Sequence, residues 1–374
     1  MIKKAKRIGR IRRTVLNILG PDRTKMILSW HLRKSFKQST VSFPHFNSSK
    51  ILINLPLSRL ELIYQLENLL ALLSRFKESE VKLLCPASAV SFFGGLPNIH
   101  IIDYIEEEMK FFSYQWNSIS KEIKEQFDLV INLEKSPSMP LLYLLGTSRA
   151  PVRIGYEQAG DYPFINIRLK NANGTAGLAE RNKVIANYLG AAKSGKLKWG
   201  VSKTTTEEIK QLLKEHGLRS STVLIGIDFH SIEAAYGAEW ARTLMDSFTN
   251  RLSGQCYLFG GLEEEHYQTR VVEKAIQLPP QSVPRTAALI ATTDLIITAK
   301  SLILGLTQLS STRMVAVLTE QEAALYCKSS ESVKPVIIAK PDHNSLKLIT
   351  EAVLEQHALI NKEKSSVANR SKMI

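Results

Sequence analysis

From residue 50 onward the sequence alternates between short runs of β-forming residues and longer segments whose apolar residues recur at helical spacing. In the first half this pattern predicts strands at 51–55, 81–85, 99–102, 128–133 and 152–156, with helices at 59–76 and around 141–145. In the second half it predicts strands at 222–227, 255–259, 295–298, 314–318 and 336–339, and helices at 206–216, 238–251, 264–277, 284–292, 302–309 and 345–357. Such alternation is the signature of a parallel sheet covered by helices, so we expect an α/β fold.

The length of the chain and one interruption of the pattern indicate two domains. A chain of 374 residues is long for a single hydrophobic core. The stretch 190–203 is rich in Gly, Ser and Lys and has no strong period, so it is the expected interdomain connection. We therefore expect a basic N-terminal segment (1–49), two doubly wound Rossmann-like domains (50–195 and 196–360) and a loose polar tail (361–374). Two such domains facing each other leave a cleft at the carboxyl ends of their strands, where ligands bind.

The cysteines and the apolar runs argue against several classes of protein. Cys85, Cys256 and Cys327 are widely spaced and form no Cys/His cluster, so neither a disulfide framework nor a zinc site is indicated. No apolar run reaches the roughly 18 to 20 residues that cross a bilayer, and the N-terminus lacks the continuous apolar segment of a secretory signal. These features favour a cytoplasmic location.

The net charge is concentrated at the N-terminus. Residues 1–40 contain twelve Lys or Arg and a single acid, Asp22, so they carry eleven of the fourteen net positive charges. Such a basic, partly apolar segment can lie on an anionic bilayer, each nearby cation contributing on the order of 1 kcal/mol. Two alternatives stay open: residues 26–36 pack a helix on the body with a solvated basic face, or the segment binds nucleic acid. No recognition motif supports nucleic acid, so we prefer a peripheral position at the inner face of the cytoplasmic membrane.

One loop of the second half carries a pair of glycines. After the strand at 255–259, Gly260 and Gly261 lead into an acidic helix start that contains Glu263. Such a loop lets backbone N–H groups approach a phosphate, and the acid can hold ribose hydroxyls. A tight turn with ordinary helix capping explains the same residues equally well.

Two further loops of the second half also carry residues suited to an anionic ligand. Asp228 and His230 follow the first strand of this half, where His230 could donate to a phosphate oxygen. Lys300 and Ser301 follow the strand at 295–298 and precede an apolar helix, so a cation and a capping hydroxyl stand at the positive helix end. The alternatives are a surface histidine without a role, and a Ser301 that only caps its helix beside a solvated Lys300.

In the first half, the loop 56–61 contains Arg59 and Glu61. A carboxylate that enters the cleft there could act as general base on a sugar hydroxyl. Glu61 can also be an ordinary first-turn acid that complements the helix dipole. The sequence shows no Ser-His-Asp arrangement, no P-loop, no G-x-G-x-x-G and no metal-ligand spacing, so hydrolase, kinase and dehydrogenase functions lose support and we expect no metal or cofactor.

Four segments carry a family resemblance. Asp128-Leu-Val-Ile-Asn-Leu-Glu-Lys-Ser136 and Arg153-Ile-Gly-Tyr156 look like the motifs D-L-V-I-D-L-Q-G and R-I-G-F. Tyr257-Leu-Phe-Gly-Gly-Leu-Glu-Glu264 looks like V-L-L-G-G-P-E-E, and Ala287-Ala-Leu-Ile-Ala-Thr-Thr-Asp-Leu-Ile-Ile297 looks like the run before a donor motif. In this order, over roughly residues 50–355, they resemble glycosyltransferase family 9, the ADP-heptose:lipopolysaccharide heptosyltransferases.

The resemblance implies a metal-independent enzyme of the GT-B type. Its C-terminal domain would bind a nucleotide-sugar, and its N-terminal domain would present a lipid A–core or other envelope glycan acceptor. Glu61 then becomes the candidate base. The implied donor-side residues are Asp228, His230, Gly260, Gly261, Glu263, Lys300 and Ser301, and the implied acceptor-side residues are Arg59, Lys135 and Ser136.

The sequence also departs from the family. The family's first-loop G-D aligns with Leu60-Glu61, which keeps a carboxylate, whereas the lysine of its K-x-W segment falls near Ala234, with Tyr236 at the tryptophan. Its D-T-G-x-x-H donor motif aligns with Lys300-Ser-Leu-Ile-Leu-Gly305, which lacks the Asp, the Gly and the His. Losing one preorganised donor to developing phosphate charge can cost about 3 kcal/mol. Two functions therefore stay open: a glycosyltransferase in which Lys300 is the countercharge, and a catalytically inactive relative that acts as a membrane-associated binding or scaffold protein.

Overall fold

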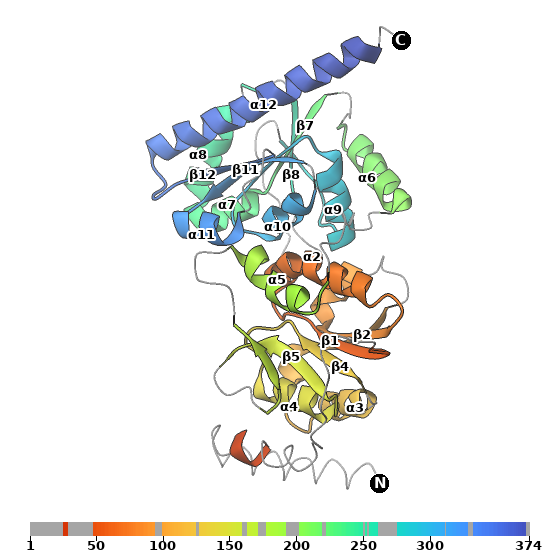
Figure 1. Ribbon diagram of the computed structural model, residues 1–374. Coiled ribbons are helices and arrows are strands. Elements are labelled where there is room, and N and C mark those ends of the chain that lie inside the picture. The colour runs from red at the N-terminus through yellow and green to blue at the C-terminus, as the bar shows by residue number, and fades with distance from the viewer. Residues whose placement is uncertain are drawn as a thin grey trace. The chain divides into compact units, whose positions relative to one another are not determined.

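The computed structural model describes residues 25–28, 48–93, 99–124, 127–158, 163–170, 177–191, 202–218, 222–249, 251–252, 254–260, 275–310, 312–327 and 332–371. Its contacts divide the chain into two compact units, Met1–Asn173 with Glu180–Leu197, and Gly174–Ala179 with Lys198–Ile374. Each unit contains one sheet flanked by helices (Figure 1). Most of the expected interdomain connection at 190–203 lies outside the described residues.

The sheet of the first unit has the strand order β3-β2-β1-β4-β5-β6. Its strands are β1 (Lys50–Asn54), β2 (Glu80–Pro86), β3 (His100–Tyr104), β4 (Leu129–Asn132), β5 (Val152–Tyr156) and β6 (Ile167–Leu169). Every neighbouring pair is parallel. The central strands are runs of buried residues, as expected of parallel strands that are covered on both faces.

The described residues of this unit from 48 onward include the helices α2 (Arg59–Arg75), α3 (Tyr114–Ile123), α4 (Met139–Thr147) and α5 (Leu178–Tyr188). Two short 3-10 segments, η1 (Ala87–Phe93) and η2 (Glu106–Glu108), lie between them. Helix α2 begins after Ser58, whose hydroxyl accepts the amide of Glu61 at 3.4 Å. On the face covered by α3 and α4, Trp116 stacks on Tyr143 with ring centroids 5.8 Å apart.

The second unit repeats this architecture. Its strands are β7 (Val223–Ile227), β8 (Gly254–Leu258), β9 (Ala275–Gln277), β10 (Leu295–Thr298), β11 (Arg313–Leu318) and β12 (Val333–Ile337), in the order β12-β11-β10-β7-β8-β9. All neighbouring pairs are again parallel. Read from β9 and from β3, the two sheets have the same order, which is that of dinucleotide-binding domains. The predicted pair of doubly wound α/β domains is confirmed.

The helices of the second unit are α6 (Lys203–Glu215), α7 (Phe229–Tyr236), α8 (Ala238–Thr249), α9 (Val283–Thr292), α10 (Leu302–Leu309), α11 (Glu320–Tyr326) and α12 (His343–Ser371). Helices α7, α8 and α12 bury one core with apolar residues of β7, β8, β10, β11 and β12. Helix α6 packs against α9 and ends at Glu215; two residues later Gly217 has a φ of 75°, a left-handed conformation that glycine adopts without strain.

Two short helices were not anticipated. Residues 228–231 were expected to form a loop, but Asp228 is the N-cap of α7, which begins at Phe229. Helix α11 is fixed by a capping box in which Thr319 and Glu322 satisfy each other's backbone amides. Each of these helices spans only about two turns, which is too short for a clear helical period.

Two predicted boundaries in the second half are wrong. Residues 275–277 were expected to end a helix, but they form the edge strand β9, in which Ile276 pairs with Tyr257 of β8; residues 264–274 lie outside the described part of the chain. The tail was expected to be loose from residue 361, whereas α12 continues to Ser371. The side chain of Glu363 contacts Arg313, and that of Lys364 lies 2.7 Å from Asp294, so long-range ion pairs hold this end of the helix.

Little of the basic N-terminal segment falls within the described residues. Residues 25–28 form a helical turn, in which Leu28 is 5% exposed and packs with the α3–α4 cluster, whereas Met26 and Ile27 are exposed. Among the described helices, none is both long enough and apolar enough to cross a bilayer. The predicted membrane contact through residues 1–40 stays a prediction.

Candidate functional site

The strand order gives each sheet one point at which a ligand is expected. In open α/β sheets, ligands bind beyond the carboxyl ends of the strands at the point where the strand order reverses. This point lies between β1 and β4 in the first unit and between β7 and β10 in the second. Glu61, Lys135 and Ser136 follow the first pair of strands, and Asp228 and Ser301 follow the second.

At the first switch point, two asparagines join the strand ends. The Nδ2 of Asn54 donates to Oδ1 of Asn132 at 2.7 Å, and both residues are buried. The Nδ2 of Asn132 donates in turn to the backbone oxygen of Glu134 at 2.8 Å. This chain of hydrogen bonds fixes the course of the β4–α4 loop relative to β1.

The side chain of Glu134 joins the two loops that leave these strands. It is 5% exposed, and its Oε2 accepts the amide of Leu57 at 2.7 Å while its Oε1 accepts the amide of Ser136 at 2.7 Å. Leu57 lies in the β1–α2 loop and Ser136 in the β4–α4 loop. A charged acceptor makes such hydrogen bonds stronger than neutral ones, so this carboxylate is a firm link between the loops.

Glu61 lies in the first turn of α2 and is partly buried. Burial raises the pKa of its carboxyl above the ordinary 4.5; the ammonium of Lys135 opposes this rise, and the carboxylate of Glu134 adds to it. A carboxylate with a raised pKa is a better proton acceptor than an ordinary surface acid. The first switch point therefore presents a group suited to general-base chemistry.

Lys135 is the cation that acts on Glu61. Burial lowers the pKa of its ammonium, Arg181 lowers it further, and Glu61 and Glu134 oppose the shift. Its Nζ lies 6.0 Å from the ring centroid of Tyr156, at the carboxyl end of β5. The hydroxyl of Tyr156 accepts from Nε2 of Gln65 at 2.9 Å and donates to the backbone oxygen of Asn182 at 3.2 Å.

The other two predicted acceptor-side residues lie close to Glu61 and Lys135 in the chain. Arg59 is the first residue of α2, two positions before Glu61, and Ser136 contributes the backbone amide that Glu134 holds. Asn182 on α5 is fully buried, and both polar atoms of its side chain lack a hydrogen-bond partner among the described residues. The structure thus brings the predicted residues Glu61, Lys135 and Ser136 to one edge of one sheet.

At the second switch point, Asp228 is the centre of a closed polar network. It is 6% exposed, and its Oδ2 accepts from the hydroxyls of Ser301 at 2.6 Å and Thr298 at 2.8 Å. Its Oδ1 accepts the amide of Ser231 at 3.4 Å. The hydroxyl of Ser231 accepts the amide of Ala299 at 3.0 Å. A carboxylate therefore stands where Ser301 caps the start of α10.

Lys300 and His230 lie at the edge of this network. The Nζ of Lys300 is 4.0 Å from a carboxylate oxygen of Glu322 and 5.2 Å from the ring centroid of Tyr326, both on α11. His230 is the second residue of α7 and is exposed. The structure brings Asp228 and Ser301 together, while Lys300 contacts α11.

The glycine loop has a packing explanation. A Cβ on Gly260 would lie 2.1 Å from the backbone oxygen of Leu278 and 2.5 Å from the backbone carbon of Pro279, so the close approach of this chain segment requires a glycine. Gly261 and Glu263 lie outside the described residues. The predicted approach of a phosphate to this loop stays a prediction.

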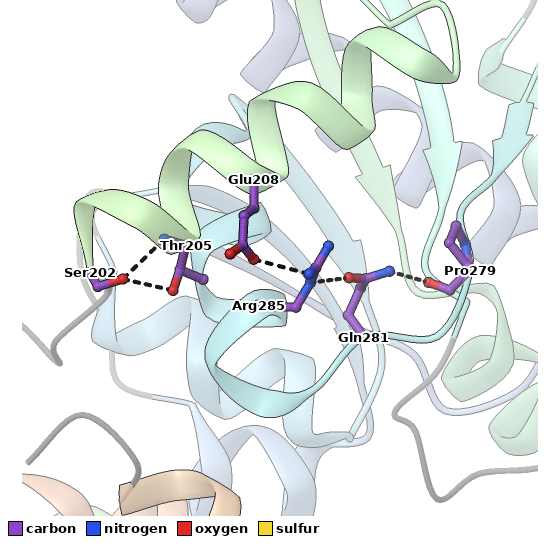
Figure 2. Close-up of polar contacts among 6 residues, drawn as sticks. All are labelled: Ser202, Thr205, Glu208, Pro279, Gln281 and Arg285. Carbon is purple, nitrogen blue, oxygen red and sulfur yellow. Dashed lines mark hydrogen bonds and ion pairs between the residues drawn. The ribbon is translucent and has the colours of Figure 1, made fainter.

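A further polar cluster holds the segment that follows β9, next to Gly260 (Figure 2). Arg285 donates through its Nε to Gln281 at 2.8 Å and pairs through its Nη1 with Glu208 at 3.0 Å, so α9 is tied to α6. Gln281 donates to the backbone oxygen of Pro279 at 2.9 Å. Hydrogen bonds of Gln281 and Arg285 therefore also fix the segment that packs on Gly260.

Comparisons with known proteins find matches among solved structures. No protein-family model matches the chain, and no curated protein matches it in sequence. A solved structure of a family 9 glycosyltransferase from Veillonella parvula matches with a TM-score of 0.64 and 18% identity, over 84% of this chain and 97% of that one. E. coli ADP-heptose lps heptosyltransferase II matches with a TM-score of 0.59 and 18% identity, over 84% and 99%. An E. coli heptosyltransferase solved with ADP matches with a TM-score of 0.59 and 13% identity, over 82% and 99%. The chain has the GT-B fold of these proteins.

Within this GT-B fold, sequence reasoning missed the residues whose role depends on neighbouring strands. Glu134 was read only as part of a motif, and Tyr156 only as the end of a strand and of a second motif. Gln281 and Arg285 gave no signal, since each is an ordinary polar residue near a predicted helix start. Among the described residues, no group of three or more His, Cys, Asp and Glu side chains is placed to hold a metal ion.

Proposed function

We propose that this protein is a glycosyltransferase that moves a sugar from a nucleotide-sugar to a hydroxyl of a glycolipid or envelope glycan. The observation that carries the proposal is the carboxylate of Glu61, which has a raised pKa and stands with Lys135 at the switch point of the first sheet. The GT-B fold supports it, because the matching heptosyltransferase structures share both Rossmann-like units.

In this reaction Glu61 acts as the general base. It takes the proton of the acceptor hydroxyl while the acceptor oxygen forms its bond to the anomeric carbon of the donor sugar. The bond from that carbon to the phosphate oxygen breaks, and the electron pair leaves with the nucleoside diphosphate. Lys135 keeps the ionised form of Glu61 accessible, since its ammonium opposes the effect of burial on the pKa of Glu61. Arg59 and Ser136 flank the acceptor.

The second unit would bind the donor without a metal ion. Lys300 supplies the positive charge for the departing diphosphate, and Ser301, Asp228 and His230 line the same end of the sheet. Gly260, with Gly261 and Glu263, would hold the ribose and the phosphates. Lys300 must then exchange its contact with Glu322 for the phosphate, which this partly exposed ion pair permits because pairs near the surface contribute only about 0 to 1 kcal/mol.

A panel of nucleotides and nucleotide-sugars, ADP-heptose among them, tests donor binding. We expect one member to raise the unfolding temperature of the wild type, because a ligand that binds only the folded state stabilises it. The shift should be lost in Lys300→Ala and kept in Lys77→Ala, whose side chain is exposed outside the site. Absence of any shift at millimolar ligand would contradict the proposal.

A second candidate is a catalytically inactive relative that serves as a binding or scaffold protein. The closed network around Asp228 favours it, because this carboxylate already accepts the hydroxyls of Thr298 and Ser301 at the start of α10. An incoming diphosphate would meet a negative charge there. Binding of a glycolipid without release of any nucleoside diphosphate from the panel would support this candidate over the enzyme.

We also propose that residues 1–40 hold the protein on the anionic inner face of the cytoplasmic membrane. The charge of this segment supports the proposal, as does Leu28, whose packing against the first unit ties the segment to that unit. Binding to vesicles with phosphatidylglycerol should fall with added salt and be absent with neutral vesicles. Replacing the seven Lys and Arg of residues 3–13 by Gln leaves Leu28 in place and should abolish sedimentation with the vesicles; unchanged sedimentation would refute the idea.

A further inference from the structure

Glu134 is a buried acid for which the reaction above has no use. Both of its oxygens are occupied by backbone amides, one from Leu57 and one from Ser136, each at 2.7 Å. Its own backbone oxygen accepts from Asn132 at 2.8 Å. Hydrogen bonds therefore fix both the side chain and the main chain of Glu134. A side chain that only fills space in the core needs no such bonds.

The two amides belong to the loops that carry the proposed base and its cation. Leu57 directly precedes Ser58, the N-cap of α2, and Glu61 lies in the first turn of that helix. Ser136 directly follows Lys135 in the chain. A link between these amides sets where α2 begins and where the Lys135 backbone lies. The two amides belong to loops that follow the neighbouring strands β1 and β4, so local chain geometry alone does not fix the distance between them.

We propose that Glu134 is a positioning residue, which ties the β1–α2 loop to the β4–α4 loop and so fixes the carboxylate of Glu61 relative to the ammonium of Lys135. This inference rests on the proposed function in its choice of Glu61 as base. Glu134 acts through its hydrogen bonds to the two loops and does not touch the substrate.

The charge of Glu134 gives this role a measurable signature. The groups that act on the carboxyl of Glu61 are Lys135 and Glu134 from the β4–α4 loop, and the phenol of Tyr156 on β5 feels Glu61 in turn. Arg181 on α5 acts on Lys135. Removing the charge of Glu134 should lower the pKa of Glu61, whereas removing that of Lys135 should raise it, because the two groups shift it in opposite directions.

Two variants separate the link from the charge. Glu134→Gln keeps the length of the side chain but loses the charge, and its amide nitrogen can only donate, so one of the two backbone amides loses its acceptor. Glu134→Asp keeps the charge but is one methylene too short to reach both amides. Carboxyl-labelled NMR on the full chain follows Glu61 directly, with assignment by Glu61→Gln, and needs no substrate.

We expect the pKa of Glu61 to fall in Glu134→Gln, to rise in Lys135→Met and to stay raised in Glu134→Asp. Turnover of ADP-heptose, measured as ADP release, should fall in both Glu134 variants by about tenfold to a hundredfold in kcat, as expected when a reacting group is misplaced, with little change in KM for the donor. The control Glu78→Gln removes an exposed acid and should change neither quantity.

An unchanged titration of Glu61 in Glu134→Gln, or full kcat in Glu134→Asp, would overturn the inference. Each variant is compared by its unfolding temperature, so that a loss of fold is seen as such. If Glu134→Asp unfolds, the titration of Glu61 in Glu134→Gln still decides, and if Glu134→Gln unfolds, the kcat of Glu134→Asp still decides. If the wild type releases no ADP, the proposed function fails while the titration continues to test the positioning role.

Discussion

Asn54 and Asn132 occupy paired positions on β1 and β4 and are joined by a side-chain hydrogen bond of 2.7 Å. Both are buried at the last residues of their strands. This pair of amide side chains makes the first switch point polar without adding a net charge. Two charged residues of the site, Glu134 and Lys135, follow Asn132 after one intervening residue, Leu133.

The first prediction concerns this pair. Asn132→Ala should lower the free energy of unfolding by about 1–3 kcal/mol, because the Nδ2 of Asn54 and the backbone oxygen of Glu134 lose their partners in a buried place. Urea unfolding measures the loss. Asn187→Ala, at an exposed helix position, is the control and should stay within about 0.5 kcal/mol. Equal losses in both variants would mean that the strand-end pair has no special role.

The second prediction is that Glu61→Gln has opposite effects on activity and on stability. Activity should fall by about a hundredfold or more, since Gln cannot accept the proton of the acceptor hydroxyl. In the wild type, kcat/KM should rise with pH through the pKa of Glu61, which lies above the ordinary 4.5. The variant should lose this rise.

Stability should change the other way. Because the folded state raises the pKa of Glu61, it binds this proton more tightly than the unfolded state does. The stability of the wild type therefore falls as the pH rises from the unfolded pKa through the folded one, and Glu61→Gln avoids that loss. The variant should be the more stable protein at pH 7, with a difference that vanishes near pH 3. A wild type that is more stable than the variant at pH 7 would contradict the raised pKa.

The third prediction concerns the contact between Lys300 and Glu322. Glu322→Gln removes the charge that Lys300 faces, but Gln keeps the capping box of α11. If Lys300 is the countercharge of the diphosphate, affinity for ADP-heptose should rise by up to about fivefold, the size of an exposed ion pair. Glu320→Gln, in the same helix turn, is the matched control. Calorimetry that finds equal affinities in the two variants would argue against Lys300 as a phosphate ligand.

The fourth prediction separates the two explanations of Gly260. Gly260→Ala should cost about 1–3 kcal/mol of stability without any ligand, because its Cβ would lie 2.1 Å from the oxygen of Leu278. Gly177→Ala should cost much less, since its Cβ would be no closer than 3.4 Å to Ala324. If Gly260→Ala keeps its stability and loses only nucleotide binding, the glycine serves the ligand rather than the packing.

Much of the fold was predictable because its strands and helices have different periods. Residues 51–53 and 129–131 are continuous buried runs, which is how strands covered on both faces look in sequence. Strand β9 was missed because three residues are too few for a period, and its backbone is satisfied by β8 rather than by a helix. The end of α12 was missed because Arg313 and Asp294, which hold it, lie about 50 and 70 residues away in the sequence.

The site was predictable only as a set of residues near strand ends. Glu61 could be named because it lies at the start of a predicted helix that follows a predicted strand, and Lys135 because it lies in a segment that resembles a family motif. The link made by Glu134 could not be foreseen, because it requires that β1 and β4 be neighbours. Lys300 was expected to face an anionic ligand, and this stays a prediction. Its neighbour Glu322 could not be foreseen, because Glu322 lies on α11, a helix of only seven residues.

Each unit closes its own sheet around its own core, so the two halves can change at different rates during evolution. A substitution at the start of α10 alters what the second unit can hold while the hydrogen bonds around Glu134 stay intact in the first. Under the proposed function, a lineage can in this way exchange the sugar donor that its second unit is proposed to bind and still keep the residues of the first unit that are proposed to hold the acceptor.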